Sequence, residues 1–75
     1  MRGDLMNLTE AVVGTEYTIS DIVTEDEELD AFLFSLGCYS GESITVISKA
    51  KRGCIVSIKD ARYSIDRNLA EAIKI

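Results

Sequence analysis

Apolar residues recur at two different spacings along this chain, one typical of a helix and one typical of strands. Four of them stand at i, i+3, i+4 and i+7, which places their side chains on one face of an α-helix. These residues are Leu29, Phe32, Leu33 and Leu36. Further along, Cys54, Val56 and Ile58 alternate with their neighbours as on the buried face of a strand. The pattern predicts one amphipathic helix over about residues 25–36, followed by β-structure.

Both ends of this helix carry sequence signals. Thr24 and Glu27 have the spacing of a capping box, and the acidic residues 25–28 lie where the helix dipole favours negative charge. We therefore expect Thr24 to open the helix. Gly37 follows Leu36, the last residue of the apolar stripe, and Gly41 comes four residues later. Glycine adopts positive φ without steric cost, so Gly37 and Gly41 are predicted to form the turn between the helix and the next strand.

Residues rich in β-branched and aromatic side chains predict the strands. The first strand is expected over residues 17–23, with a bulge or sharp bend because Ile19 and Ile22 stand three apart. Other strands are expected at 44–48, 54–59, 62–66 and 73–75, joined by a cationic turn at 49–53 and a short turn at 60–61. Short helical turns are predicted over 7–13 and 67–72. In the first of these, Asn7 and Glu10 have capping-box spacing, and Leu8, Ala11 and Val12 share a face that covers the core.

Short antiparallel strands with bent corners favour a closed or nearly closed barrel, because closure removes exposed sheet edges. The expected fold is mainly β: a small antiparallel barrel with one inserted helix and short helical turns near both ends. The predicted core includes six apolar residues: Ile19, Leu33, Leu36, Val46, Val56 and Ile65. With 75 residues, of which 47% are hydrophobic and 28% charged, we expect one globular domain over residues 1–75.

No apolar run approaches the roughly 20 residues that span a bilayer, and residues 1–6 lack the apolar segment of a secretory leader. A cytoplasmic location without membrane insertion is therefore the expectation. Charge is uneven: residues 1–42 hold ten acidic residues and one basic residue, whereas residues 43–75 hold seven basic and three acidic residues. A chain with net charge −5 is a poor general ligand for nucleic acid. The asymmetry either orients a partner or reflects a solvated helix face beside a basic hairpin.

The residues that usually carry catalysis are missing. The chain has no histidine, which removes the Ser-His and Cys-His nucleophile pairs and the imidazole base. Cys38 and Cys54 are too few to complete a zinc site, and the adjacent carboxylates at 25–28 are explained by helix capping. We expect two reduced thiols, with Cys54 buried and Cys38 near the surface. No catalytic residue, metal ligand or cofactor is assigned, and the protein is not expected to be an enzyme.

The corner between the helix and the next strand resembles a motif of the FeoA family, ferrous iron transport protein A. In that family Leu-x-x-Leu-Gly is followed, after a few residues, by Gly-x-x-Ile/Val-x-Val. Six residues fall on the pattern: Leu33, Leu36, Gly37, Gly41, Ile44 and Val46. The resemblance covers residues 7–75. It implies an SH3-like barrel, and a small cytosolic accessory protein of bacterial ferrous iron uptake that acts by binding the cytoplasmic region of the transporter FeoB.

Similar SH3-like domains are found at the C-terminus of iron- and manganese-dependent repressors. The resemblance therefore leaves an alternative function, that of a transition-metal-responsive or self-associating interaction domain. The family is associated with transition-metal binding, yet no ligand set transfers to this sequence. Weak homo-oligomerisation is also left open. The basic pair that precedes the family's leucine motif is replaced here by Ala31 and Phe32, and the chain has no proline.

SH3-like domains commonly bind extended segments through aromatic-lined surfaces. We therefore name four candidate partner-binding residues: Phe34, Tyr39, Lys51 and Arg52. Phe34 lies nearly opposite the apolar stripe, so it either packs under the N-terminal turn or is exposed for a partner. Tyr39 is the aromatic residue most expected to be exposed, because it lies on the corner.

Overall fold

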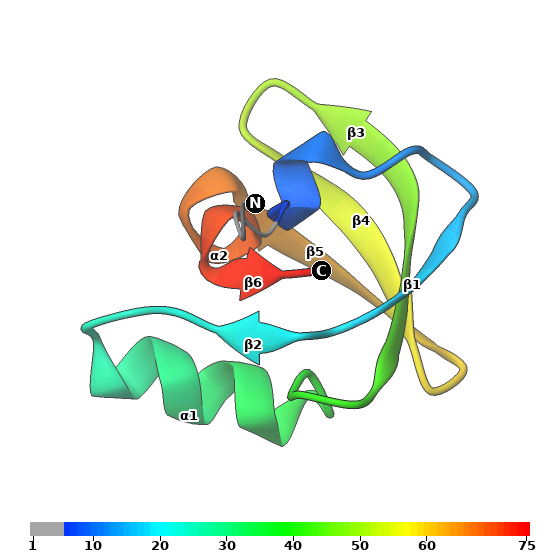
Figure 1. The fold of residues 1–75 in the computed structure, drawn as a ribbon. Coiled ribbons are helices and arrows are strands. Elements are labelled where there is room, and N and C mark those ends of the chain that lie inside the picture. The colour runs from blue at the N-terminus through cyan, green and yellow to red at the C-terminus, as the bar shows by residue number, and fades with distance from the viewer. Residues whose placement is uncertain (1–5) are drawn as a thin grey trace.

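The computed structural model describes residues 6–75. Residues 1–5, which belong to the stretch considered above for a secretory leader, lie outside the described residues. Figure 1 shows how short helices and strands follow one another along the chain. In order, the elements are η1 (Leu8–Glu10), β1 (Glu16–Thr18), β2 (Asp21–Ile22), α1 (Glu27–Ser35), β3 (Ser43–Ala50), β4 (Gly53–Ile58), β5 (Ala61–Asp66), α2 (Arg67–Ala72) and β6 (Ile73–Lys74). None of the described helices is long and apolar enough to cross a membrane.

The strands form two antiparallel sheets that together make a small barrel. One sheet has the order β1-β3-β4-β5, and the other pairs β2 with β6. The predicted first strand is divided between them at Ile19 and Ser20. Ile19 N–H donates to the Glu42 carbonyl (2.8 Å), and Ser20 N–H donates to the Lys74 carbonyl (2.7 Å). The expected bend is confirmed, and the mainly β barrel with it.

The β3–β4 hairpin is longer than the sequence indicated. β3 continues to Ala50 and β4 begins at Gly53, so only Lys51 and Arg52 form the turn. A shift of register between Val46 and Ser48 bends β3, as bulges do. In the next hairpin Lys59 and Asp60 have φ of 49° and 68°. Two successive residues at positive φ are the signature of a type I′ turn, whose twist suits a two-residue hairpin.

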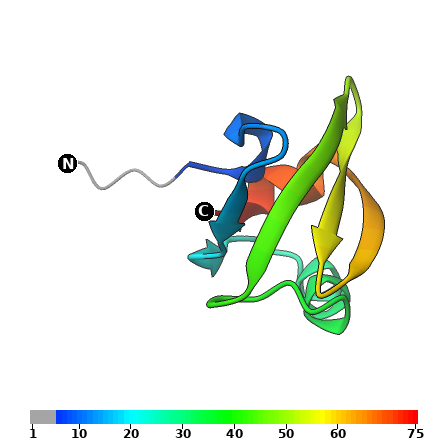
Figure 2. The same cartoon turned by 90° about the vertical axis from the view of Figure 1, so that its right-hand side faces the viewer.

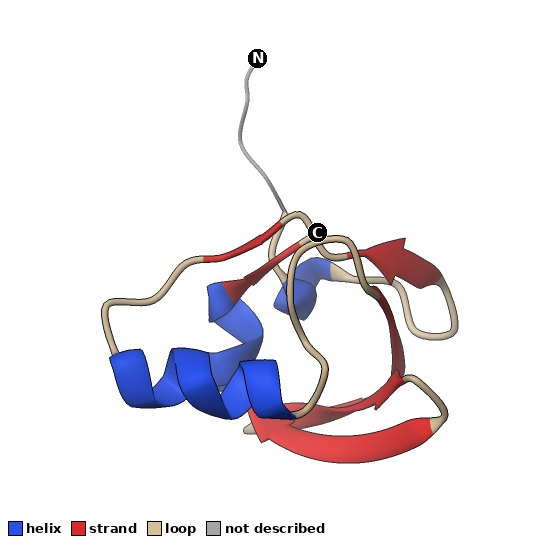
Figure 3. Ribbon diagram, turned by 90° about the horizontal axis from the view of Figure 1, so that it is seen from below, coloured by secondary structure: helices blue, strands red, loops and turns tan. Residues whose placement is uncertain are grey.

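Helix α1 covers the end of the barrel that faces the viewer in Figure 3. Five of the six predicted core residues are buried, but Leu36 is only half-buried. Within α1 only Leu33 is fully buried, and Phe32 is 48% exposed. The buried face of α1 is therefore narrower than the four-residue apolar stripe predicted from the sequence. A short helix set against the end of a barrel contacts the core along a narrow edge, and its flanking apolar residues stay at the surface.

The start of α1 also differs from the prediction. Asp26 is the N-cap, and its carboxylate accepts hydrogen bonds from Glu28 N–H (2.9 Å) and Leu29 N–H (3.3 Å). Thr24 lies two residues earlier, where its hydroxyl accepts from Asp26 N–H (3.1 Å). An ionised carboxylate accepts more strongly than a hydroxyl and complements the helix dipole, which favours Asp26 over Thr24.

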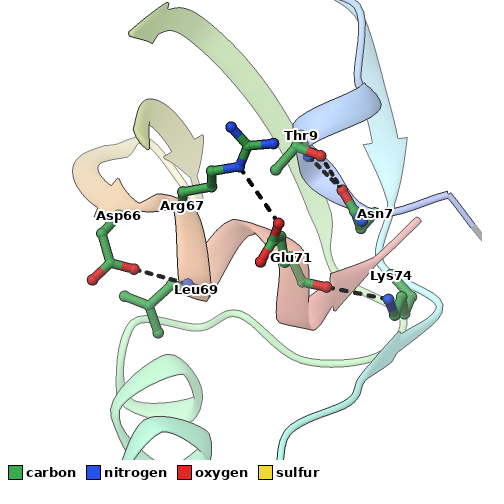
Figure 4. Close-up of polar contacts among 7 residues, drawn as sticks. All are labelled: Asn7, Thr9, Asp66, Arg67, Leu69, Glu71 and Lys74. Atoms are coloured by element: carbon green, nitrogen blue, oxygen red, sulfur yellow. Dashed lines mark hydrogen bonds and ion pairs between the residues drawn. The ribbon is translucent and has the colours of Figure 1, made fainter. Parts of the chain in front are cut away.

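Both predicted helical turns form (Figure 4). In η1, Thr9 N–H donates to the Asn7 side chain (2.9 Å), and Asn7 N–H donates to Glu10 Oε1 (3.1 Å), which completes the capping box. In α2, the Asp66 carboxylate accepts from Leu69 N–H (2.8 Å). The prediction that Val12 covers the core is wrong, since Val12 is 63% exposed. The helical turn ends at Glu10, and the extended backbone at Ala11 carries Val12 outward.

Candidate partner-binding surface

The corner after α1 has the geometry that its glycines predicted. Gly37 and Gly41 have φ of +87° and +93°. Cys38 N–H donates to the Leu33 carbonyl (2.9 Å), and Gly37 N–H donates to the Phe34 carbonyl (3.0 Å). This pair of hydrogen bonds is the Schellman motif, in which a residue at positive φ satisfies the last helical carbonyls. The position of the residues that follow is thereby fixed.

The same motif explains why the prediction for Cys38 was wrong. The residue after the left-handed one often packs against the third residue from the helix end, and here these are Cys38 and Leu33. Both are 1% exposed, so Cys38 belongs to the core and not to the surface. Burial raises the pKa of the Cys38 thiol to about 11. Cys54 is buried as predicted, burial raises its pKa too, and both thiols are free.

Two aromatic residues meet on the outside of this corner. Phe34 is 66% exposed, so of the two alternatives for its position the exposed one holds, and packing under the N-terminal turn does not occur. Its ring lies against Tyr39, with centroids 5.0 Å apart and planes inclined by 35°. Tyr39 is half-buried rather than fully exposed. Offset aromatic pairs of this kind gain stability beyond the area that they bury.

Lys59, from the β4–β5 turn, holds Tyr39 in place. Its ammonium donates to the Tyr39 hydroxyl (2.9 Å), forms an ion pair with Glu42 (3.2 Å), and lies 5.1 Å from the centre of the Tyr39 ring. The pKa of Lys59 is raised, first by the hydrogen bond to Tyr39 and then by that to Glu42. We call Phe34, Tyr39, Glu42 and Lys59 the aromatic corner. Sequence reasoning missed Lys59 and Glu42, because nothing local indicates that the turn reaches this point.

The other two candidate residues, Lys51 and Arg52, lie elsewhere. Both are exposed at the turn between β3 and β4. β3 begins near the aromatic corner and runs for eight residues before this turn. At the rise of an extended strand this corresponds to about 25 Å. Figure 1 shows the turn at the top of the barrel and α1 at the bottom. The four candidates therefore form two separate surfaces.

A hollow beside the cationic turn, between η1, the β3–β4 hairpin and α2, is lined in part by basic side chains. The hollow has a volume of about 170 Å³, and Lys49, Lys51 and Arg67 are among the residues that line it. The Lys49 ammonium already donates one hydrogen bond, to the Thr9 carbonyl (3.0 Å).

Among residues 6–75 no three histidine, cysteine, aspartate or glutamate residues lie close enough together to hold a metal ion.

Solved structures share this fold. One is an iron uptake regulatory protein (FeoA), with a TM-score of 0.84, 24% identity and 95% of each chain covered. Another is FeoA of Stenotrophomonas maltophilia complexed with zinc and described as a prokaryotic SH3 domain protein. Its TM-score is 0.79 at 18% identity, with 91% of this chain and 86% of that chain covered. The predicted SH3-like barrel is thus confirmed.

A third similar structure is a manganese-dependent transcriptional repressor, with a TM-score of 0.86 and 19% identity. The match covers 93% of this chain but 40% of the repressor. A comparison with curated protein sequences gave no match. The sequence model of the FeoA domain matches residues 6–75, almost the whole chain, and this protein therefore belongs to the FeoA family, which is associated with ferrous iron transport.

Proposed function

We propose that this protein is a cytoplasmic accessory of bacterial ferrous iron uptake that acts by binding the cytoplasmic region of the transporter FeoB. Membership of the FeoA family supports the link to ferrous iron transport. The family is not a known family of enzymes, and the chain has no histidine to serve as a general base. Its action on the transporter is therefore one of binding, without catalytic turnover.

The aromatic corner is the observation that carries this proposal. Residues that dominate binding energy at protein interfaces are often aromatic, and they work best when their conformation is fixed before binding. Phe34 is 66% exposed, yet its ring rests on Tyr39, which Lys59 holds through its hydroxyl. The Phe34 ring thus presents apolar area to a partner, on a support fixed by the barrel. We assign it the role of anchor in the complex with FeoB.

The cationic turn has a different role in this proposal. Lys51 and Arg52 are exposed and far from the aromatic corner. Exposed charges outside the contact itself can still steer a partner toward it, so they contribute mainly to the rate of association. Replacement of both residues by glutamate should slow binding to the FeoB region and weaken its dependence on ionic strength. Replacement by glutamine should give an intermediate rate, because it removes the charges without reversing them.

Calorimetric titration against the purified cytoplasmic region of FeoB tests the anchor. Phe34→Ala should weaken binding by about 1–2 kcal/mol, roughly 5- to 30-fold, mainly through faster dissociation. Phe32→Ala is the matched control, since Phe32 is also exposed and lies on the same helix but outside the aromatic corner. Equal affinities for Phe34→Ala and the parent would contradict the anchor role.

The fold match to the manganese-dependent repressor supports a second candidate function, a transition-metal-responsive or self-associating interaction domain. Weak binding of a transition metal through unassigned ligands belongs to this candidate. Titration with manganese, ferrous iron and zinc, followed by NMR, tests it. This function would be favoured over the first if the metals shift NMR resonances of the protein and the FeoB region does not bind to it.

A further inference from the structure

One edge of the barrel is open. β5 is the last strand of the four-stranded sheet, and among residues 6–75 it pairs only with β4. Figure 2 shows it at the margin of the sheet, with no strand of the described part of the chain on its outer side. The sequence predicts a closed or nearly closed barrel without exposed sheet edges. The barrel is not closed along β5, which leaves one edge exposed. An edge strand presents unpaired backbone groups that can bind another strand.

The backbone groups that face outward can be identified from the pairing of β4 with β5. Ile58 pairs with Ala61 across the two-residue turn, and hydrogen-bonded pairs alternate from there. The Arg67 N–H···O=C Arg52 bond (2.8 Å) fits this alternation one step beyond the strand. Ala61, Tyr63 and Ile65 therefore bond to β4. The backbone groups of Arg62 and Ser64, and the N–H of Asp66, point away from β4 and toward solvent.

We propose that two copies of this chain associate through β5, in an antiparallel pair centred on Ser64. The twofold axis sets Ser64 of one copy opposite Ser64 of the other, and the two exchange a pair of N–H···O=C hydrogen bonds. On either side, Asp66 N–H of one copy faces the Arg62 carbonyl of the other. The two four-stranded sheets thereby become one continuous sheet of eight strands.

Charge selects this register. Arg62 and Asp66 flank Ser64 at equal distances in the sequence, and both are exposed. Pairing about Ser64 places Arg62 of each copy opposite Asp66 of the other, so the dimer contains two equivalent pairs of opposite charge. Pairing about Arg62 or about Asp66 instead places like charges opposite each other, which destabilises a strand pair. Charged edge residues often prevent association, but here their order permits one symmetric arrangement.

The other side chains along the edge suit the same arrangement. Tyr63, which is half-buried, stands opposite Ile65 of the second copy in each non-hydrogen-bonded pair, so this register opposes no charged residues on the core face of the sheet. Ile55, which pairs with Ser64 within the chain, is 41% exposed beside the edge. Phe32 of α1 lines a hollow together with Ser64 and Asp66. An added strand would reduce the exposure of these two apolar side chains.

Capping does not prevent Asp66 from meeting Arg62. One carboxylate oxygen of Asp66 accepts from Leu69 N–H at the start of α2 (2.8 Å), and a carboxylate has acceptor sites on both oxygens. Arg62 forms neither of the two side-chain ion pairs seen among residues 6–75, which are Lys59–Glu42 and Arg67–Glu71. The proposal does not depend on contact with FeoB, and its test needs only this protein.

Sedimentation equilibrium of the full chain from micromolar to millimolar concentration tests the proposal. We expect a monomer–dimer equilibrium that weakens as salt is added, because the ion pairs are exposed. Ser64→Pro removes the central N–H, which points away from β4, and should weaken the dimer at least about tenfold. Ser64→Ala keeps that N–H and should associate nearly as the parent does.

A second variant covers the case in which Ser64→Pro does not fold. Arg62→Asp places aspartate opposite Asp66 twice and should weaken association about tenfold, whereas Arg62→Gln should have a smaller effect. Amide hydrogen exchange gives the location: protection of Ser64 should rise with protein concentration, whereas that of Tyr63 should be high throughout. A monomer at every concentration would overturn the proposal, as would a dimer that Arg62→Asp leaves unchanged.

Discussion

Replacement of Gly37 by valine probes the corner that joins α1 to β3. Gly37 has φ of +87°, a conformation that disfavours any residue with a Cβ atom and β-branched residues above all. A Cβ built at this position would lie 3.3 Å from Lys59 Cδ and 3.6 Å from Ile58 Cγ2. The first contact is tight, but it involves a flexible side chain that can shift. Backbone strain is therefore the main effect, with crowding of Lys59 added to it.

The expected magnitude follows from these two effects. A residue with a Cβ atom held in the left-handed region costs about 1–2 kcal/mol, and β-branching places valine at or above the upper end of that range. We expect Gly37→Val to lower the free energy of unfolding by about 2 kcal/mol. For a domain of this size, that corresponds to a decrease in Tm of roughly 8–16 °C.

Thermal unfolding followed by circular dichroism measures this change, and urea unfolding measures the free energy directly. Gly41→Val is the matched control, because Gly41 has φ of +93° but nothing within 4 Å of its built Cβ. It isolates backbone strain, and the difference between the two variants reports the crowding of Lys59. A Gly37→Val protein with the Tm of the parent would refute the reasoning.

Three further predictions concern the core, the caps and metal. Because the folded pKa of Cys38 is raised to about 11 from an ordinary 9.0, ionisation favours the unfolded chain in this interval and stability falls as pH rises. The loss has a limit of about 1.4 kcal/mol per pH unit, and urea unfolding of Cys38→Ala should lack this component. Asn7→Ala removes the η1 cap and should cost about 1 kcal/mol in the same assay, whereas Thr15→Ala, at an exposed position without a cap, should cost little. A chelator should leave the circular dichroism spectrum unchanged, because apolar burial builds the core; collapse of the spectrum would reveal a structural metal site.

Local signals in the sequence predicted the elements well. The capping box at Asn7, the helical turn from Arg67 to Ala72, and the positive φ of Gly37 and Gly41 all form as expected. Each of these depends on residues no more than a few positions apart, so short-range hydrogen bonds and backbone sterics determine them. The burial of Cys38 was also locally encoded, because its place in a Schellman motif points it toward the core.

Features that depend on distant parts of the chain were harder to predict. The exposure of Phe32 and the half-burial of Leu36 follow from how α1 meets the barrel, and helical periodicity alone does not report this. The aromatic corner needs Lys59, which lies 20 positions after Tyr39 and arrives there through the pairing of β3 with β4. The open edge of β5 likewise depends on strand order.

The central claim, that the aromatic corner binds FeoB, is tested most directly by NMR. The isotope-labelled protein would be titrated with the cytoplasmic region of FeoB, with and without a GTP analogue and ferrous iron. We predict that the amide resonances of Phe34, Tyr39 and Lys59 shift or broaden first, and that in Phe34→Ala the remaining changes need roughly 5- to 30-fold more of the FeoB region. Unperturbed resonances under all of these conditions, or changes confined to residues remote from the aromatic corner, would contradict the claim.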